Sequence, residues 1–129
     1  MADRDPLLDP YVMYLVVRKN LKMGVGKVAS QCGHAVQMLM QEYLPDKHRS
    51  VTGEEYERHV ATRLWLEEDF PKYTKIVLGA DDDEFMKVQL ENDHFFVVVD
   101  RKLATETVIG LWPILKSEAS VTVKTLRPL

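Results

Sequence analysis

The sequence contains one cysteine and no long apolar segment. No apolar run approaches the ~20 residues that a membrane-spanning helix needs, so we expect no membrane span. The acidic N-terminus has no apolar core of the kind found in secretory signals, and it fits no transit peptide. A lone thiol, Cys32, suits a reducing compartment, and its position on the apolar side of a predicted helix indicates a core residue rather than a nucleophile. We therefore expect a cytoplasmic protein.

Internal repeats and low-complexity tracts are also missing, and the 129 residues are enough for one domain with a sizeable core. The hydrophobic content of 46% and the charged content of 29% are ordinary for a globular protein. We expect residues 1–10 to form a flexible tail and residues 11–129 to form the domain.

The net charge of −3 argues mildly against a nucleic-acid partner, but the charges are unevenly distributed. Residues 10–41 carry four basic side chains and none of the 20 acidic ones. A basic loop on an acidic protein can still provide a local phosphate-binding surface, although a solvated run of charge would look the same.

Apolar periodicity predicts an alternation of strands and helices. Strands are expected over residues 11–17, 74–80, 94–99 and 105–112. Helices are expected over residues 27–43 and 54–69, and from an acidic cap at 81–83 to about residue 92. A short helix is expected after Pro113, and a loop is expected over residues 45–52. This β-α-α-β-α-β-β-α order predicts a three-layer α/β/α domain with a four-stranded sheet. Because residues 100–104 cannot hold a crossover helix, the last two strands either form a hairpin or are separated by an abrupt turn, and we expect a mixed sheet.

The segment that joins the first strand to the first helix is rich in residues that can carry chemistry. It places Gly24, Gly26 and Lys27 at the predicted turn and Gln31 and His34 along the helix that follows. A lysine at a helix N-terminus is locally unfavourable by about 0.3–1 kcal/mol, so its presence there suggests an anion or a developing oxyanion to be bound.

Two phosphate-binding motifs fit this segment poorly. A Walker A loop would need Gly and Ser or Thr where the chain has Leu21 and Val28. A dinucleotide fingerprint would need a second strand within roughly 30 residues, and none is expected before residue 74. An ordinary strand-to-helix turn with a solvated lysine remains an alternative.

The run Lys22-Met-Gly-Val-Gly-Lys-Val-Ala-Ser-Gln-Cys-Gly-His-Ala35, with the apolar strand and Arg18 before it, resembles the N-terminal signature of type 2 peptidyl-tRNA hydrolases. Further segments, 75–78 and 105–113, resemble later strands of that family. The resemblance implies the same α/β fold, hydrolysis of the ester between peptide and tRNA without metal or other cofactor, a tRNA partner, and a homodimer.

The resemblance also implies the site. Its catalytic lysine falls on Lys27 and its aspartate on Asp100, which ends an apolar strand at the sheet edge where α/β sites gather. His34 matches the motif and is a further candidate catalytic residue. Candidate substrate-binding residues are Arg18, Lys19, Lys22, Gly24, Gly26, Gln31, Lys75, Arg101 and Thr105. A salt bridge between Lys27 and Asp100 without a catalytic role is the alternative.

The chain departs from the family pattern after Asp100. The family continues with Ala-Gly-x-Thr-Gln, whereas this chain has Arg101-Lys-Leu-Ala104, and the distance from Asp100 to Pro113 is several residues shorter. The short loop resembles the divergent peptidyl-tRNA hydrolase domain-containing branch. Two hypotheses follow, a peptidyl-tRNA hydrolase and an RNA- or protein-binding module on the same fold that has lost hydrolysis.

Overall fold

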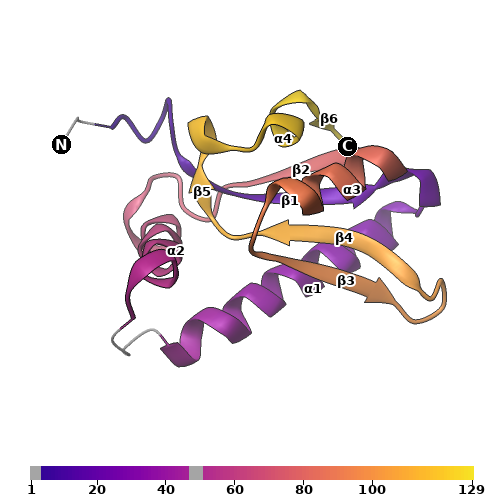
Figure 1. Cartoon of the computed structure of the whole chain (residues 1–129), viewed down its shortest axis with the longest axis horizontal. Helices are drawn as coiled ribbons and strands as arrows, with labels where there is room; N and C mark the ends of the chain where they lie inside the picture. Colours follow the sequence, from indigo (N-terminus) through magenta and orange to yellow (C-terminus); the bar gives the residue numbers. More distant parts are fainter. Residues whose placement is uncertain (1–3, 47–50) are drawn as a thin grey trace.

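The computed structural model describes residues 4–46 and 51–129, which form a mixed α/β domain (Figure 1). The strands are β1 Tyr11–Arg18, β2 Lys75–Ala80, β3 Phe95–Asp100, β4 Thr105–Leu111, β5 Ile114–Leu115 and β6 Arg127–Pro128. The helices are α1 Val25–Tyr43, α2 Gly53–Arg63, α3 Asp82–Glu91 and α4 Val121–Thr125. A π-helical turn, Leu64–Glu68, continues α2.

The strand order is β3-β4-β1-β2-β6, with β5 also paired to β1. β1 and β2 are parallel, while β3 and β4 form an antiparallel hairpin, which confirms the predicted mixed sheet. The predicted number of strands was wrong, because β5 and β6 bring the sheet to six strands within the described residues. β5 follows β4 along the same side of β1 with its register shifted by one residue, because Pro113 lacks the N–H that would continue the ladder.

Both faces of β1 are buried, as its near-continuous apolar sequence predicts. Val12, Tyr14 and Val16 pack in one cluster with residues of α3 and α4. Met13, Leu15 and Val17 pack in a second cluster with Cys32, Ala35 and Leu39 of α1 and with Trp65. The helices therefore cover both faces of the sheet, α1 on one and α3 and α4 on the other (Figure 1).

The predicted helix boundaries need small corrections. α1 begins at Val25, two residues before the predicted start, with Gly24 as its N-cap. The segment after Pro113 forms β5 and a 3₁₀ turn before α4, so the short helix begins later than its proline. Asp81 caps α3 through a reciprocal pair of hydrogen bonds with Glu84, as its acidic start predicts.

Two predicted segments extend beyond the described residues. Residues 1–3 of the predicted tail and residues 47–50 of the predicted loop lie outside them. Within residues 4–10, Arg4 pairs with the buried Asp69 at 2.7 Å, and the same carboxylate accepts a hydrogen bond from the Tyr11 N–H.

Among the described residues, no helix combines the length and hydrophobicity needed to cross a bilayer.

Candidate active site

The carboxyl ends of β1, β2 and β3 lie at one edge of the sheet, together with the start of β4. β1 ends there at Arg18 and leads through a short 3₁₀ turn to α1, whose first turn contains Lys27. β3 ends at the same edge with Asp100. The topology therefore brings together two residues that are far apart in sequence.

Lys27 donates a hydrogen bond to Asp100, with 2.6 Å between Nζ and Oδ2. The Asp100 side chain is only 6% exposed, whereas that of Lys27 is 39% exposed. The carboxylate is thus held inside the edge of the sheet, and the ammonium lies over it at the surface. A ligand that approaches this edge would meet the ammonium first.

Asp100 is also the anchor of its own loop. The Leu103 N–H donates to Asp100 Oδ1 at 2.7 Å, and the Ala104 N–H donates to the Asp100 carbonyl at 2.8 Å. Ala104 takes a left-handed backbone conformation with φ of 53°. The hydrogen bond from Lys27, followed by the one from the Leu103 N–H, lowers the pKa of Asp100 below its ordinary value, so the carboxylate is ionised at neutral pH.

A β-bulge positions a buried polar link beside this pair. The register between β3 and β4 shifts at Val98/Val99, which leaves Thr107 as the extra residue. Its hydroxyl accepts a hydrogen bond from Gln31 Nε2 at 2.9 Å and donates to the Val98 carbonyl at 3.0 Å. Because Gln31 is on α1 and Val98 on β3, this link fixes the helix that carries Lys27 relative to the strand that carries Asp100.

Thr107 was not among the predicted site residues, although it lies in the segment 105–113 that resembles a later strand of the family. The residue looked like an ordinary strand position, and only the strand register identifies it as the bulge. Its position opposite the buried Gln31 follows from that register.

A shallow pocket of about 250 Å³ opens next to Lys27. It is lined by Leu21, Lys22, Met23, Gly24, Lys27, Lys102 and Leu103. A Cβ added to Gly24 or Gly26 would meet no atom within 4 Å, so the surface over both glycines is open. Lys19, Arg101 and Lys102 are exposed around the same edge.

The other predicted residues lie as follows. Arg18 contributes to the structure of the edge, since it pairs with Asp82 at 2.8 Å and donates to Thr105 Oγ1 at 2.7 Å. Lys75 begins β2, opposite Met13, and is therefore at the other end of the strands. Its Nζ donates to the Tyr73 carbonyl and lies 5.4 Å from the Trp65 ring.

His34 is exposed on α1, where a ring nitrogen lies 3.4 Å from Ser30 Oγ. Seven residues separate it from Lys27, which corresponds to about 10 Å along the helix. The structure therefore does not bring His34 into the Lys27–Asp100 pair, and a catalytic role for it stays a prediction.

Cys32 is buried, and burial raises the pKa of its thiol, as suits a core residue. Within the described residues, no group of three or more His, Cys, Asp and Glu side chains is placed so that it could hold a metal ion.

Comparison with known proteins agrees with the sequence motif. The family model for peptidyl-tRNA hydrolase PTH2 matches residues 11–129. A probable peptidyl-tRNA hydrolase 2 of Drosophila melanogaster is 64% identical over 28 residues, which are 22% of this chain and 15% of that protein. Because the family model covers almost the whole domain, the chain belongs to the peptidyl-tRNA hydrolase PTH2 family.

Proposed function

We propose that this member of the family hydrolyses the ester between a peptide and the terminal ribose of tRNA, by attack of water and without a metal ion. The observation that carries the proposal is the Lys27–Asp100 pair, a buried carboxylate and an accessible ammonium 2.6 Å apart at an open edge of the sheet. In the reaction, water adds to the ester carbonyl and the ribose oxygen leaves. One proton of the water goes to the ribose oxygen and the other is released to solvent, so the products are a peptide carboxylate and tRNA with a free hydroxyl.

Asp100 is suited to orienting the attacking water. Its carboxylate accepts hydrogen bonds from Lys27 and from the Leu103 N–H, and it retains lone pairs that can accept a hydrogen bond from water. A strong general base would have a pKa near the working pH, whereas the hydrogen bonds lower the pKa of Asp100. We therefore assign Asp100 to holding the water rather than to removing its proton completely.

Lys27 is suited to stabilising the oxyanion. Its ammonium lies in the first turn of α1, where free backbone N–H groups and the helix dipole already provide positive potential. Positive charge fixed where negative charge develops lowers the barrier of acyl transfer. The open surface over Gly24 and Gly26 would allow the ester to approach this turn closely.

Exposed basic side chains at the same edge would bind the acceptor end of tRNA. Lys19, Lys22, Arg101 and Lys102 are exposed, whereas Arg18 is already paired with Asp82 and would act mainly by shaping the edge. A cytoplasmic role in removing peptides from tRNA, and a homodimer, are parts of the same proposal.

The test is hydrolysis of a labelled N-acetylated aminoacyl-tRNA in the presence of a metal chelator. We expect release of the N-acetylated amino acid by the wild-type chain, with Lys27→Ala and Asp100→Asn nearly inactive. Binding of tRNA measured in parallel should weaken with salt, with a log–log slope of roughly −3 to −4 for four or five phosphate contacts. Absence of hydrolysis by a folded wild-type chain would contradict the proposal.

A second function, binding of RNA or protein without hydrolysis, is supported by the short loop after Asp100. Where the family pattern has a threonine, the loop has Ala104, which carries no hydroxyl. The nearby Thr105 hydroxyl is engaged by Arg18. Salt-dependent tRNA binding without turnover in the same assay would favour this alternative.

A further inference from the structure

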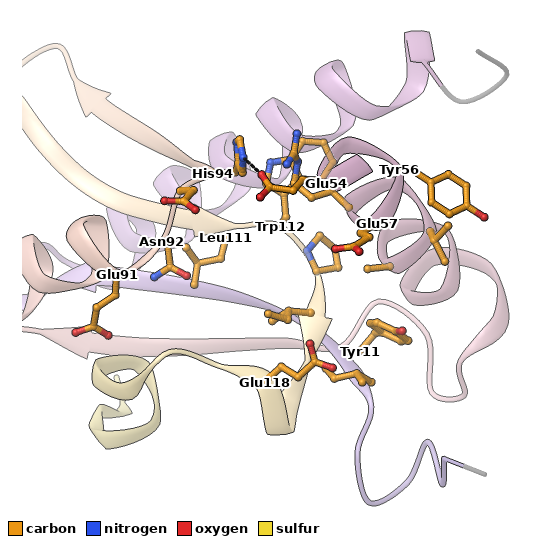
Figure 2. Close-up of a pocket in the computed structure, with 17 residues that line it drawn as sticks. Tyr11, Glu54, Tyr56, Glu57, Glu91, Asn92, His94, Leu111, Trp112 and Glu118 are labelled. Carbon is orange, nitrogen blue, oxygen red and sulfur yellow. Dashed lines mark hydrogen bonds and ion pairs between the residues drawn. The ribbon is translucent and has the colours of Figure 1, made fainter. Parts of the chain in front are cut away.

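A larger cavity lies at the end of the sheet opposite Lys27. Its volume is about 670 Å³, and its walls come from α2, the turn between α3 and β3, and the segment from the end of β4 through β5 (Figure 2). Tyr11 at the start of β1 lines it, whereas Arg18 at the end of β1 belongs to the candidate active site. An eight-residue strand is about 25 Å long, so the two sites are well separated.

The walls of this cavity are strongly acidic. Its carboxylates are Glu54, Glu57, Glu91, Asp93 and Glu118. Glu91 is engaged by Thr122, and Glu54 lies 3.4 Å from the His94 ring. Among the described residues, Glu57, Asp93 and Glu118 have no hydrogen-bond or ion-pair partner. Figure 2 shows Glu57 and Glu118 reaching toward the cavity from different walls.

This excess of negative charge limits what the cavity can bind. It would repel the phosphates of nucleic acids and the headgroups of anionic lipids, because like charges at close range are unfavourable. It would attract lysine and arginine side chains. The acidic cavity and the basic edge around Lys27 thus select different kinds of partner.

Arg58 adds a second requirement. Its Nε and Nη1 atoms are buried and have no hydrogen-bond partner among the described residues, while its guanidinium lies 5.5 Å from the centre of the Trp112 ring. Buried N–H donors without a partner are rare in proteins and call for an acceptor. Among so many carboxylates a free anion is disfavoured, whereas the neutral carbonyl of a peptide backbone could accept from Arg58 once its side chain, whose Nε and Nη1 are buried, turns toward the cavity.

The remaining wall is apolar. Leu111 and Pro113 are buried, and Val60, Ala61 and Ile114 are half-buried, so the cavity offers hydrophobic surface between its acidic sides. We propose that this cavity binds a basic, amphipathic segment of a partner protein. The cationic side chains would pair with Glu57 and Glu118, the apolar ones would pack on Ile114, and the backbone would satisfy Arg58. The proposal does not depend on hydrolysis of tRNA.

The test uses a dye-labelled synthetic peptide, Gly-Arg-Leu-Gly-Arg-Leu-Gly, and the intact chain. Fluorescence anisotropy measures binding, and amide shifts in NMR spectra locate it. We expect saturable binding, with shifts concentrated in residues 54–61 and 111–118. A peptide with glutamate in place of arginine should not bind, and one with serine in place of leucine should bind more weakly.

Charge reversal at the cavity provides the matched comparison. Glu57→Lys should weaken binding of the arginine peptide by about tenfold, because it replaces an attraction with a repulsion. Asp83→Lys makes the same change in net charge on the first turn of α3, outside the cavity, and should leave binding nearly unchanged. If Glu57→Lys melts at a much lower temperature than the wild type, Glu118→Lys takes its place.

Several results would overturn the proposal. These are equal weakening of peptide binding by Glu57→Lys and Asp83→Lys, binding of the glutamate peptide, and amide shifts that map to the edge around Lys27. Amide shifts in the cavity residues on addition of a tRNA acceptor hairpin would also overturn it. Self-association of the chain that Glu57→Lys abolishes would also overturn it, because the occupant would then be a second copy.

Discussion

Replacement of Lys27 by alanine separates a catalytic role for this residue from a structural one. The variant removes the ammonium that lies 2.6 Å from Asp100 and leaves the carboxylate with its hydrogen bond from the Leu103 N–H. If the ammonium stabilises the oxyanion, turnover should fall by about 10²–10³, the usual cost of removing one such group.

The expected change in stability is small. Lys27 is partly exposed, and its removal from the first turn of α1 relieves an unfavourable interaction with the helix dipole of about 0.3–1 kcal/mol. This gain offsets part of the lost pairing with Asp100. The melting temperature should therefore change by no more than about 4 °C.

The assay is steady-state hydrolysis of N-acetylated aminoacyl-tRNA at a series of substrate concentrations, with thermal melting followed by circular dichroism. Lys102→Ala is the matched control, because the Lys102 side chain lines the same pocket, whereas its backbone N–H, which hydrogen-bonds to Asp100, is kept in alanine. It should raise KM and leave kcat nearly unchanged. Unchanged kcat in Lys27→Ala would exclude Lys27 from the mechanism, and a large drop in melting temperature would favour the purely structural salt bridge.

Three further results are expected. Thr107→Val leaves the buried amide of Gln31 without its acceptor, so the free energy of unfolding should fall by about 1–3 kcal/mol. The value of kcat should also fall, because α1 is then held less firmly against β3. No change in the free energy of unfolding or in kcat would refute the positioning role. Because the pKa of Asp100 is lowered, the ionised carboxylate contributes stability above its ordinary pKa, and this contribution disappears as pH falls through the lower folded value. Asp100→Asn should therefore lose less stability than the wild type on acidification, as measured by denaturant melts at a series of pH values. Replacing Arg101–Ala104 with a family-length loop containing Ala-Gly-x-Thr-Gln should raise turnover without much change in tRNA affinity, and a graft that binds but remains inactive would favour the binding module.

The main elements could be predicted because their apolar patterns are long. An eight-residue strand whose six central residues are buried, on both faces of the sheet, and a nineteen-residue amphipathic helix give clear signals. β5 and β6 have two residues each, so they have no periodicity, and each lies beside or contains a proline that argues against a strand. Their pairing depends on where the larger strands place them.

The site could be predicted only in part. Asp100 and Lys27 follow from the sequence motif and from their places at the end of β3 and after β1, whose carboxyl ends lie at the same edge of the sheet. Lys75 is placed at the other end because it begins its strand rather than ending it. Thr107 could not be predicted, since it depends on a one-residue shift of register that no local pattern records. The acidic cavity combines residues from four separate segments.

The lowered pKa of Asp100 leads to a prediction about the pH dependence of hydrolysis. If Asp100 only orients water, it is ionised throughout the neutral range, and kcat/KM should be nearly constant between about pH 6 and 8. A general base that titrates in this range would instead give an inflection. An inflection in this range that disappears in His34→Gln would identify His34 as that base. Because His34 lies about two helical turns from Lys27, such a result would require the substrate to bridge the two. A flat profile, unchanged in His34→Gln, would leave Lys27 and Asp100 as the pair that acts on the ester.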